Sequence, residues 1–288
     1  MSEPTATSVT GADGLSLAVY DWHGTGPPTL LAHPTGFHGR VWAPTARRLV
    51  AAGRRVYSFD FRGHGDSDRS GAGYHWHGFA ADALAVVRHL GLAGDPDLVA
   101  VGHSKGATSL LLGEADAPGT YPAIYSYEPI VFPTDRSLPP HHDNPLSAGA
   151  RRRRDTWESP EEAYAAYAAK PPLDVFTPEA LHAYVDSGLR ARDDGEWELK
   201  CRPADEAQVY TMGSTSGVWG RLPEVASPVL VACGARTDAI DPDLAARIAQ
   251  RLPAGRLEVF DELGHFGPME DPDALVASIL DFAAAFPA

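Results

Sequence analysis

Short apolar runs alternate with amphipathic stretches over the first 133 residues of the chain. The runs that have the character of strands are 15–22, which alternates, and 29–33, 55–61, 97–101 and 123–127. Between them, residues 40–53 and 77–92 place apolar side chains at helical spacing. Strands that alternate with helices predict a mostly parallel sheet joined by right-handed crossovers. The continuous apolar character of the strands predicts that helices cover both faces of this sheet.

This rhythm breaks after residue 133, and no buried strand is evident again until residues 228–234. The intervening stretch has helix starts instead. Ser159-Pro160-Glu161-Glu162 has the form of a capping box, and Thr177-Pro178 is a second start. The alternation then resumes with a helix at 242–252, a strand at 256–260 and a helix at 273–286. We therefore expect a core formed by residues 1–133 and 216–288, interrupted by a helical insertion at 134–215.

One motif stands at the junction of a predicted strand and a predicted helix. Residues 102–106 read Gly-His-Ser-Lys-Gly, which matches the pattern G-x-S-x-G. A serine held in a strained strand-to-helix turn is exposed above the sheet, and larger side chains at either glycine would clash with neighbouring backbone. Ser104 is therefore the candidate nucleophile.

A serine nucleophile needs a base, and the base needs an acid that orients it. His265 follows the strand 256–260 and Asp238 follows the strand 228–234, so both lie at the sheet edge expected for Ser104. Two other carboxylates compete for the acid position. Asp241 precedes Pro242 as a helix cap would, and Glu128 directly follows the strand 123–127. The order serine, acid, histidine along the chain favours Asp238.

Two further motifs lie in the first third of the chain. "LLAHPTGFHGRVW" carries His33 and Trp42, and "FDFRGHGDS" carries the pattern D-x-R-G-x-G-x-S. With the serine motif and the late histidine, these resemble the α/β-hydrolase superfamily over nearly the whole chain. The resemblance implies a mostly parallel eight-stranded sheet, with the insertion forming a cap. It also implies a catalytic set of Ser104, Asp238 and His265, with Arg62 and Asp66 bracing a loop.

The resemblance also implies an oxyanion hole made by backbone N–H groups. Lys105 would supply one donor, and Thr35 the other, with Phe37 as the alternative. Pro34 departs from the family pattern, which has glycine there, and proline has no N–H to donate. The Lys105 side chain begins at a helix N-terminus, where a cation is unfavourable, so we expect an ion pair with Glu128.

The amino-acid composition excludes some classes of binding partner. The formal net charge of −14 argues against nucleic acid and against an anionic membrane surface. Neither a membrane span nor a signal peptide is evident, and the two cysteines have no paired spacing. We expect a cytoplasmic protein that acts on a small molecule without a cofactor; a homodimer stays open.

Several side chains are ambiguous in the sequence. Residues 150–158 read "ARRRRDTWE", either a pocket for an anion or, as we favour, a solvated helix face with i,i+4 pairs. The pairs His75/His77 and His141/His142 lack a third ligand cluster, so no metal site is expected. The aromatic residues expected to line a substrate pocket are Phe37, Trp42, Phe132, Trp157 and Phe266.

These observations favour a serine hydrolase that cleaves an ester or a related carbonyl compound. The same scaffold hosts carbon–carbon bond hydrolases, lactonases, thioesterases and cofactor-free perhydrolases, so the fold does not select among them. A small-molecule receptor that retains the hydrolase scaffold is the alternative outside catalysis.

Overall fold

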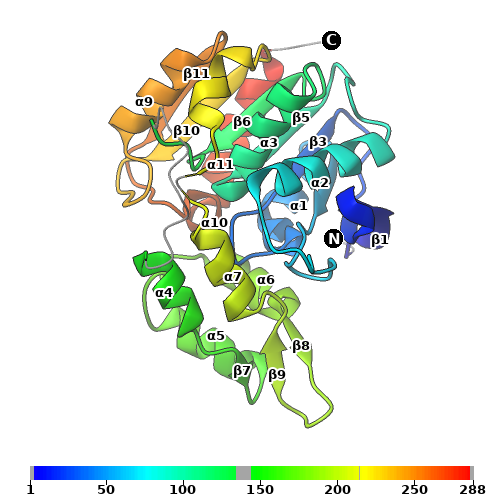
Figure 1. The fold of residues 1–288 in the computed structure, drawn as a ribbon, viewed down its shortest axis with the longest axis vertical. Coiled ribbons are helices and arrows are strands. Elements are labelled where there is room, and N and C mark those ends of the chain that lie inside the picture. The colour runs from blue at the N-terminus through cyan, green and yellow to red at the C-terminus, as the bar shows by residue number, and fades with distance from the viewer. Residues whose placement is uncertain (1–2, 134–143, 214, 286–288) are drawn as a thin grey trace.

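The computed structural model describes residues 3–133, 144–213 and 215–285 (Figure 1). Its centre is an eight-stranded sheet in the order β1-β2-β4-β3-β5-β6-β10-β11. The strands are β1 (Thr5–Thr10), β2 (Ser16–Asp21), β3 (Pro28–Ala32), β4 (Arg55–Phe59), β5 (Val99–His103), β6 (Ala123–Tyr127), β10 (Val229–Gly234) and β11 (Gly255–Phe260). β2 is antiparallel to both of its neighbours, and the strands from β4 to β11 run parallel. The predicted sheet is confirmed.

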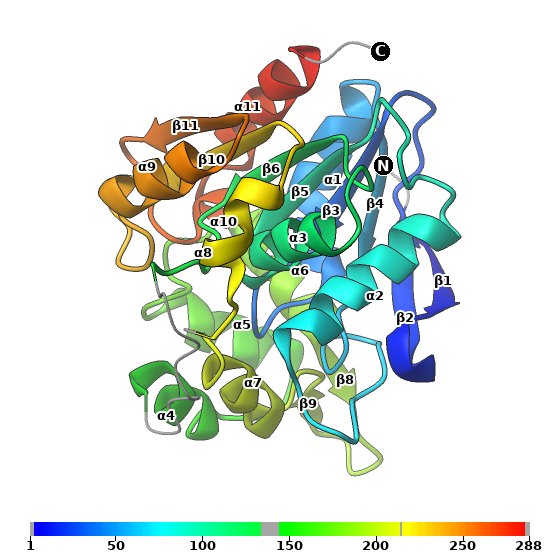
Figure 2. The same cartoon turned by 45° about the horizontal axis from the view of Figure 1, so that its top comes forward.

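Helices cover both faces of this sheet, as the apolar strands predict (Figure 2). On one face lie α1 (Ala43–Ala51) and α11 (Pro272–Ala284). On the other lie α2 (Trp76–His89), α3 (Lys105–Asp116), α8 (Val218–Arg221) and α9 (Pro242–Arg251). The short α10 (Gly267–Glu270) precedes α11, and 3₁₀ turns occupy Ala12–Gly14, Gly39–Trp42 and Leu222–Glu224.

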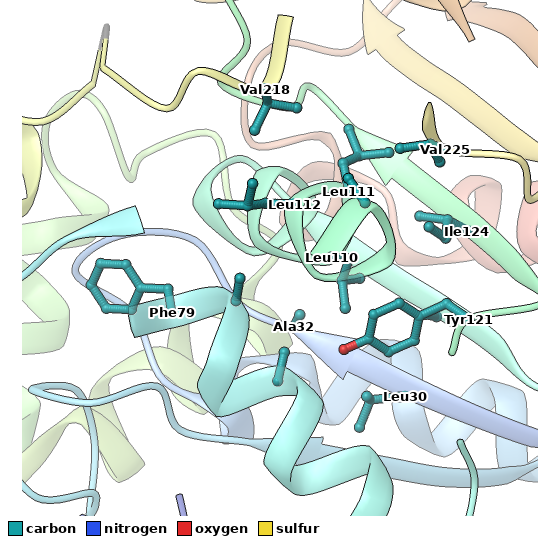
Figure 3. Packing of buried hydrophobic residues seen from close by; sticks show 14 of the residues in the cluster. Leu30, Ala32, Phe79, Leu110, Leu111, Leu112, Tyr121, Ile124, Val218 and Val225 are labelled. Carbon is teal, nitrogen blue, oxygen red and sulfur yellow. The ribbon is translucent and has the colours of Figure 1, made fainter. Parts of the chain in front are cut away.

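Alternating side chains along each strand fill two separate cores. In β3, Leu30 and Ala32 join the cluster beneath α2 and α3, whereas Leu31 joins the cluster beneath α1 and α11. Figure 3 shows the first cluster, where leucines of α3 point outward from the helix toward Val225, toward Val218 and toward Tyr121. Burial of this apolar surface fixes the position of α3, and α3 in turn fixes the residue that precedes it.

The segment between β6 and β10 lies at one end of the molecule in Figure 1. Its helices are α4 (Pro145–Arg151), α5 (Pro160–Ala168), α6 (Pro178–Gly188) and α7 (Pro203–Tyr210). Both predicted helix starts are confirmed, because Ser159 accepts a hydrogen bond from the Glu162 N–H and Thr177 accepts one from the Ala180 N–H. We call this segment the cap.

The cap is not purely helical. It contains a small antiparallel sheet of β7 (Thr156–Trp157), β9 (Trp197–Leu199) and β8 (Leu189–Ala191). Strands of two or three residues are too short for an alternating pattern to be recognised. β1 was not predicted for another reason. Five of its six residues are exposed, so its sequence lacks the apolar positions that mark a buried strand.

Polar contacts join the cap to the sheet domain. The His38 imidazole Nε2 donates to the carbonyl oxygen of Tyr184 at 3.0 Å. Lys200 Nζ lies 2.8 Å from an Asp66 carboxylate oxygen, and the Lys200 carbonyl accepts from the Arg69 guanidinium at 3.0 Å. The cap therefore packs directly over the loops that follow β3 and β4. Among the described residues, no helix has both the length and the apolar character to cross a membrane.

Candidate active site

Ser104 occupies a sharp turn between β5 and α3. Its backbone has φ 54° and ψ −117°, a conformation that residues other than glycine rarely adopt. The glycines on either side explain how the turn closes. A Cβ on Gly102 would lie 2.4 Å from the Ala107 Cα, and one on Gly106 would lie 2.2 Å from the Ala32 carbonyl oxygen. Both glycines are therefore required by close backbone contact, as the motif predicts.

His265 lies in the loop after β11, beside the serine turn. Its backbone carbonyl accepts a hydrogen bond from His103 Nε2 at 2.8 Å, and the two imidazole rings are 5.0 Å apart. The Tyr127 hydroxyl donates to the carbonyl of the preceding Gly264 at 2.7 Å. The residue next to Ser104 and the last residue of β6 thus hold this loop in place.

The His265 imidazole contacts a carboxylate through Nδ1. Nδ1 donates to Glu128 Oε2 at 2.6 Å, and the Glu128 side chain is fully buried. The Thr237 hydroxyl donates to the same oxygen at 2.7 Å, and the Gly234 N–H donates to Oε1 at 3.0 Å. Glu128 itself has φ 44°, a second strained residue at this edge of the sheet.

The prediction that Asp238 contacts His265 is therefore wrong. Asp238 is exposed, and the loop after β10 turns so that the hydroxyl of Thr237 faces Glu128 instead. Glu128 follows β6, which lies directly beside both β5 and β10, and its side chain reaches Nδ1 of His265 in the loop after β11. Asp241 caps α9 through the Leu244 N–H, as its position before Pro242 predicts.

Lys105 is also placed differently from the prediction. Its side chain is 1% exposed, and Nζ lies 4.1 Å from the Phe61 ring centroid and 4.5 Å from that of Phe79. Nζ has no hydrogen-bond partner in the described part of the chain, so the expected ion pair with Glu128 is not formed. Burial of the ammonium lowers the pKa of Lys105 to about 7.

The loop after β3 packs against the serine turn and beneath the cap. His33 Nε2 accepts from the Phe61 N–H at 3.1 Å, so its protonated Nδ1 donates to the Pro34 carbonyl at 2.7 Å. Gly36 has φ 80°, and a Cβ there would lie 2.5 Å from a Glu206 carboxylate oxygen of the cap. Thr35 and Phe37 are both buried, and the choice between their N–H groups as oxyanion donors stays a prediction.

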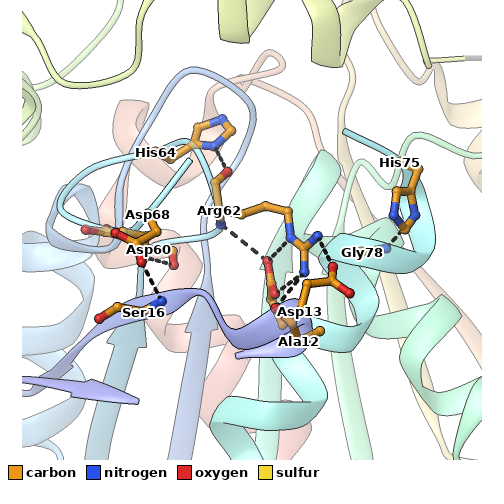
Figure 4. A network of polar contacts seen from close by, with 11 residues as sticks. Ala12, Asp13, Ser16, Asp60, Arg62, His64, Asp68, His75 and Gly78 are labelled. Carbon is orange, nitrogen blue, oxygen red and sulfur yellow. Dashed lines mark hydrogen bonds and ion pairs between the residues drawn. The ribbon is translucent and has the colours of Figure 1, made fainter. Parts of the chain in front are cut away.

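The motif D-x-R-G-x-G-x-S at residues 60–67 holds the surrounding loops in place through polar contacts (Figure 4). Asp60 accepts hydrogen bonds from the Gly39 and Asp66 N–H groups at 2.5 and 2.7 Å, and burial raises its pKa to about 6. Arg62 makes two 2.7 Å contacts with Asp82 and one of 2.9 Å with Asp13. Arg62 thus ties the loop after β4 to α2, as expected, while Asp66 holds Lys200 of the cap.

Aromatic side chains form one wall beside His265. The Phe266 ring is 5.2 Å from the His265 ring and 5.8 Å from Phe37, which in turn lies 4.8 Å from Tyr184 of the cap. Of the other predicted pocket residues, Trp157 joins this wall only through Tyr167, at 5.3 Å. Trp42 is enclosed in the core under α1, and Phe132 packs against the opposite cluster.

Arg153 is a residue whose setting the sequence does not reveal. It lies beyond the end of α4, and its guanidinium contacts Glu206 at 2.8 Å and the hydroxyls of Tyr167 and Tyr184. The favoured prediction of a solvated helix face for residues 150–158 is therefore wrong, because the helix ends at Arg151. Arg154 pairs with Glu162 rather than Glu158. Four adjacent arginines give no signal for which one points inward.

No group of three or more histidine, cysteine or acidic side chains is placed to hold a metal ion in the described residues. His141 and His142 lie outside the described residues.

The part of the chain that contains Ser104, Glu128 and His265 matches a known family. The family model for the alpha/beta hydrolase family matches residues 29–278. The chain belongs to this family. Among curated proteins, this α/β hydrolase is 43% identical over 98 residues to a non-heme haloperoxidase of Rhodococcus erythropolis, a match that spans 34% of each chain.

Longer matches have lower identity. BpoC of Mycobacterium tuberculosis, which is named as a putative non-heme bromoperoxidase, is 28% identical over 271 residues, covering 92% of this chain and 97% of BpoC. Among solved structures, E-2-(acetamidomethylene)succinate hydrolase superposes with a TM-score of 0.81 at 21% identity, covering 98% and 99% of the two chains. An enol-lactonase of Burkholderia xenovorans gives 0.72 at 20% identity, covering 96% of this chain and all of that one. At such identities the structural neighbours establish the fold and leave the reaction open.

Proposed function

We propose that this α/β hydrolase is a serine hydrolase that cleaves an ester or a related carbonyl compound through an acyl-enzyme, without a cofactor. The observation that carries the proposal is the 2.6 Å hydrogen bond from His265 Nδ1 to the buried Glu128, beside a serine in a strained turn. A base oriented by a carboxylate and set next to a serine is the arrangement that activates a hydroxyl for attack.

In the proposed reaction, Ser104 Oγ attacks the substrate carbonyl carbon while His265 Nε2 takes the hydroxyl proton. Glu128 accepts the hydrogen bond from Nδ1 throughout, which fixes the tautomer and stabilises the imidazolium. The Lys105 N–H and an N–H of Thr35 or Phe37 would hold the oxyanion, and one such donor is typically worth about 3 kcal/mol. His265 then protonates the leaving group, and the carbonyl–leaving group bond breaks.

Water resolves the acyl-enzyme in the second half of the reaction. His265 removes a proton from water, the resulting hydroxide attacks the acyl carbon, and the bond to Ser104 Oγ breaks as the proton returns to the serine. The aromatic wall of Phe37, Phe266 and Tyr184 would exclude bulk water from the acyl group and favour small to medium substrates.

Perhydrolysis is a second candidate, favoured by the sequence matches to haloperoxidases and to an Acinetobacter calcoaceticus protein named as a bifunctional esterase/perhydrolase. In that reaction hydrogen peroxide replaces water as the acceptor of the acyl group, and a peracid leaves. An assay with acetate, hydrogen peroxide and bromide separates it from simple hydrolysis: the peracid oxidises bromide, and the product brominates monochlorodimedone.

A fluorophosphonate probe tests the nucleophile. The parent protein should be labelled, and Ser104→Ala should not. A panel of p-nitrophenyl esters of increasing acyl length would then define the substrate size. Absence of labelling in the folded parent protein would contradict the enzyme assignment and favour a small-molecule receptor.

A further inference from the structure

Lys105 differs from two cationic side chains of the cap that have carboxylate partners. Arg153 pairs with Glu206, and Lys200 pairs with Asp66. Lys105, by contrast, has neither an ion pair nor a hydrogen bond in the described part of the chain. It is also the most deeply buried of the three, at 1% exposed.

No carboxylate near Lys105 is free to pair with it. The carboxylates whose charges act on it are Asp82 and Asp60, and both are occupied. Asp82 holds Arg62 through two 2.7 Å contacts, and Asp60 accepts from two backbone N–H groups and a tyrosine hydroxyl. The faces of Phe61 and Phe79 attract the ammonium, but a ring accepts none of its hydrogen bonds in the way that an oxygen atom does.

Two histidine rings interact electrostatically with Lys105, and neither accepts a hydrogen bond from it. His33 Nε2 accepts from the Phe61 N–H. His64 donates through Nδ1 to the Arg62 carbonyl, so its buried Nε2 is an acceptor, and it has no partner among the described residues. Cys201 is the cap residue that interacts electrostatically with Lys105. Burial raises the pKa of the Cys201 thiol, so the thiol stays neutral and does not balance the charge of the ammonium. An ammonium left without an acceptor in such a setting costs several kcal/mol, which an anionic ligand would recover.

Lys105 is also the immediate neighbour of the nucleophile. Its own backbone N–H is a proposed oxyanion donor, so an acyl group on Ser104 would begin within one residue of the lysine side chain. We propose that the Lys105 ammonium binds a carboxylate carried by the acyl part of the substrate, so that the enzyme prefers half-esters or half-amides of short dicarboxylic acids. This proposal rests on the serine hydrolase reaction proposed above and names its substrate class.

Matched ester substrates test this preference. Mono-p-nitrophenyl succinate and p-nitrophenyl butyrate share a leaving group and differ at the acyl end, in a carboxylate against a methyl group. The ratio of their kcat/KM values should favour the succinate ester in the parent protein, and Lys105→Met should lower that ratio by about tenfold or more. Lys200→Met removes a cap cation that is already paired, so it should leave the ratio within about threefold. A ratio that is unchanged by Lys105→Met would overturn the proposal.

A binding measurement separates this proposal from the proposed reaction. In a Ser104→Ala background, isothermal titration calorimetry with succinate should give a dissociation constant about tenfold or more lower for Lys105 than for Lys105→Met, whereas butyrate should show no such difference. If the parent protein has no turnover but succinate binding in the Ser104→Ala background depends on Lys105, the subsite is supported and only the reaction is contradicted. If fluorophosphonate labels the parent protein but succinate binding in the Ser104→Ala background is equal with and without Lys105, only the subsite is contradicted.

Discussion

The Thr237 hydroxyl stands between the exposed Asp238 and the carboxylate that His265 contacts. It donates to Glu128 Oε2 at 2.7 Å, the same oxygen that accepts from His265 Nδ1 at 2.6 Å. With the Gly234 N–H on the other oxygen, Glu128 has three donors in a fully buried position. Such donors fix the orientation of the carboxylate, which makes Thr237 a positioning residue for His265.

Removal of this hydroxyl should weaken catalysis without abolishing it. Thr237→Val keeps the shape of the side chain but removes one of three donors to Glu128, so kcat/KM on a p-nitrophenyl ester should fall about tenfold. Thr237→Ser restores the hydroxyl and should recover most of the rate. Equal rates for Val, Ser and Thr would show that the hydroxyl has no positioning role.

The serine turn depends on two glycines that touch backbone from neighbouring elements. Gly106→Ala would place a methyl group 2.2 Å from the Ala32 carbonyl oxygen, so α3 would have to move away from β3. The free energy of unfolding should fall by about 3 kcal/mol or more, and fluorophosphonate labelling of Ser104 should slow. Urea denaturation followed by tryptophan fluorescence measures the first effect.

Gly149 in α4 is the matched control for this substitution. A Cβ there meets nothing within 4 Å, and alanine is the better helix former, so Gly149→Ala should raise stability by about 0.5–1 kcal/mol. If both alanine variants had the same stability as the parent protein, the close contact at Gly106 would not be a constraint.

The buried strands of the central sheet, the helices that cover it and the serine turn were predictable because each has a local pattern. Apolar runs, helical spacing, capping residues and two glycines are all short-range signals. The acid had no such signal: Glu128 and Asp238 follow adjacent strands, β6 and β10, and end at the same sheet edge. The two carboxylates are told apart only by the direction of their side chains. The loop after β10 leaves Asp238 exposed, whereas Glu128 faces His265. Arg153 is similar, because its inward direction depends on where α4 ends.

Buried neutral histidines should make the whole molecule sensitive to acid. Burial lowers the pKa of His38 to about 4 and lowers the pKa values of His33, His64 and His103 well below their usual range. The unfolded chain therefore binds more protons than the folded one as the pH falls below about 6.5, so folding stability is lost in that direction. The raised pKa values of the Asp60, Asp82 and Glu270 carboxyls oppose this trend, but they are three groups against four.

Denaturant titrations between about pH 7.5 and about pH 5 should therefore show a fall of about 2 kcal/mol or more in the free energy of unfolding. His38→Gln removes one of the four groups and should make this fall smaller. His23→Gln, at an exposed position, should leave it unchanged. A stability that is constant over this range would contradict the assignment of these histidines as neutral in the folded state.

The identity of the acid tests the proposed reaction most directly. Steady-state kcat/KM should be measured for Glu128→Gln and Asp238→Asn on the best ester of the p-nitrophenyl panel, with folding checked by circular dichroism. Glu128→Gln keeps the size of the side chain but removes the charge that orients His265, so kcat/KM should fall by about 10³ to 10⁴. Asp238→Asn should stay within about threefold of the parent protein. A large loss in Asp238→Asn together with a near-normal rate in Glu128→Gln would contradict a catalytic arrangement of Ser104, His265 and Glu128.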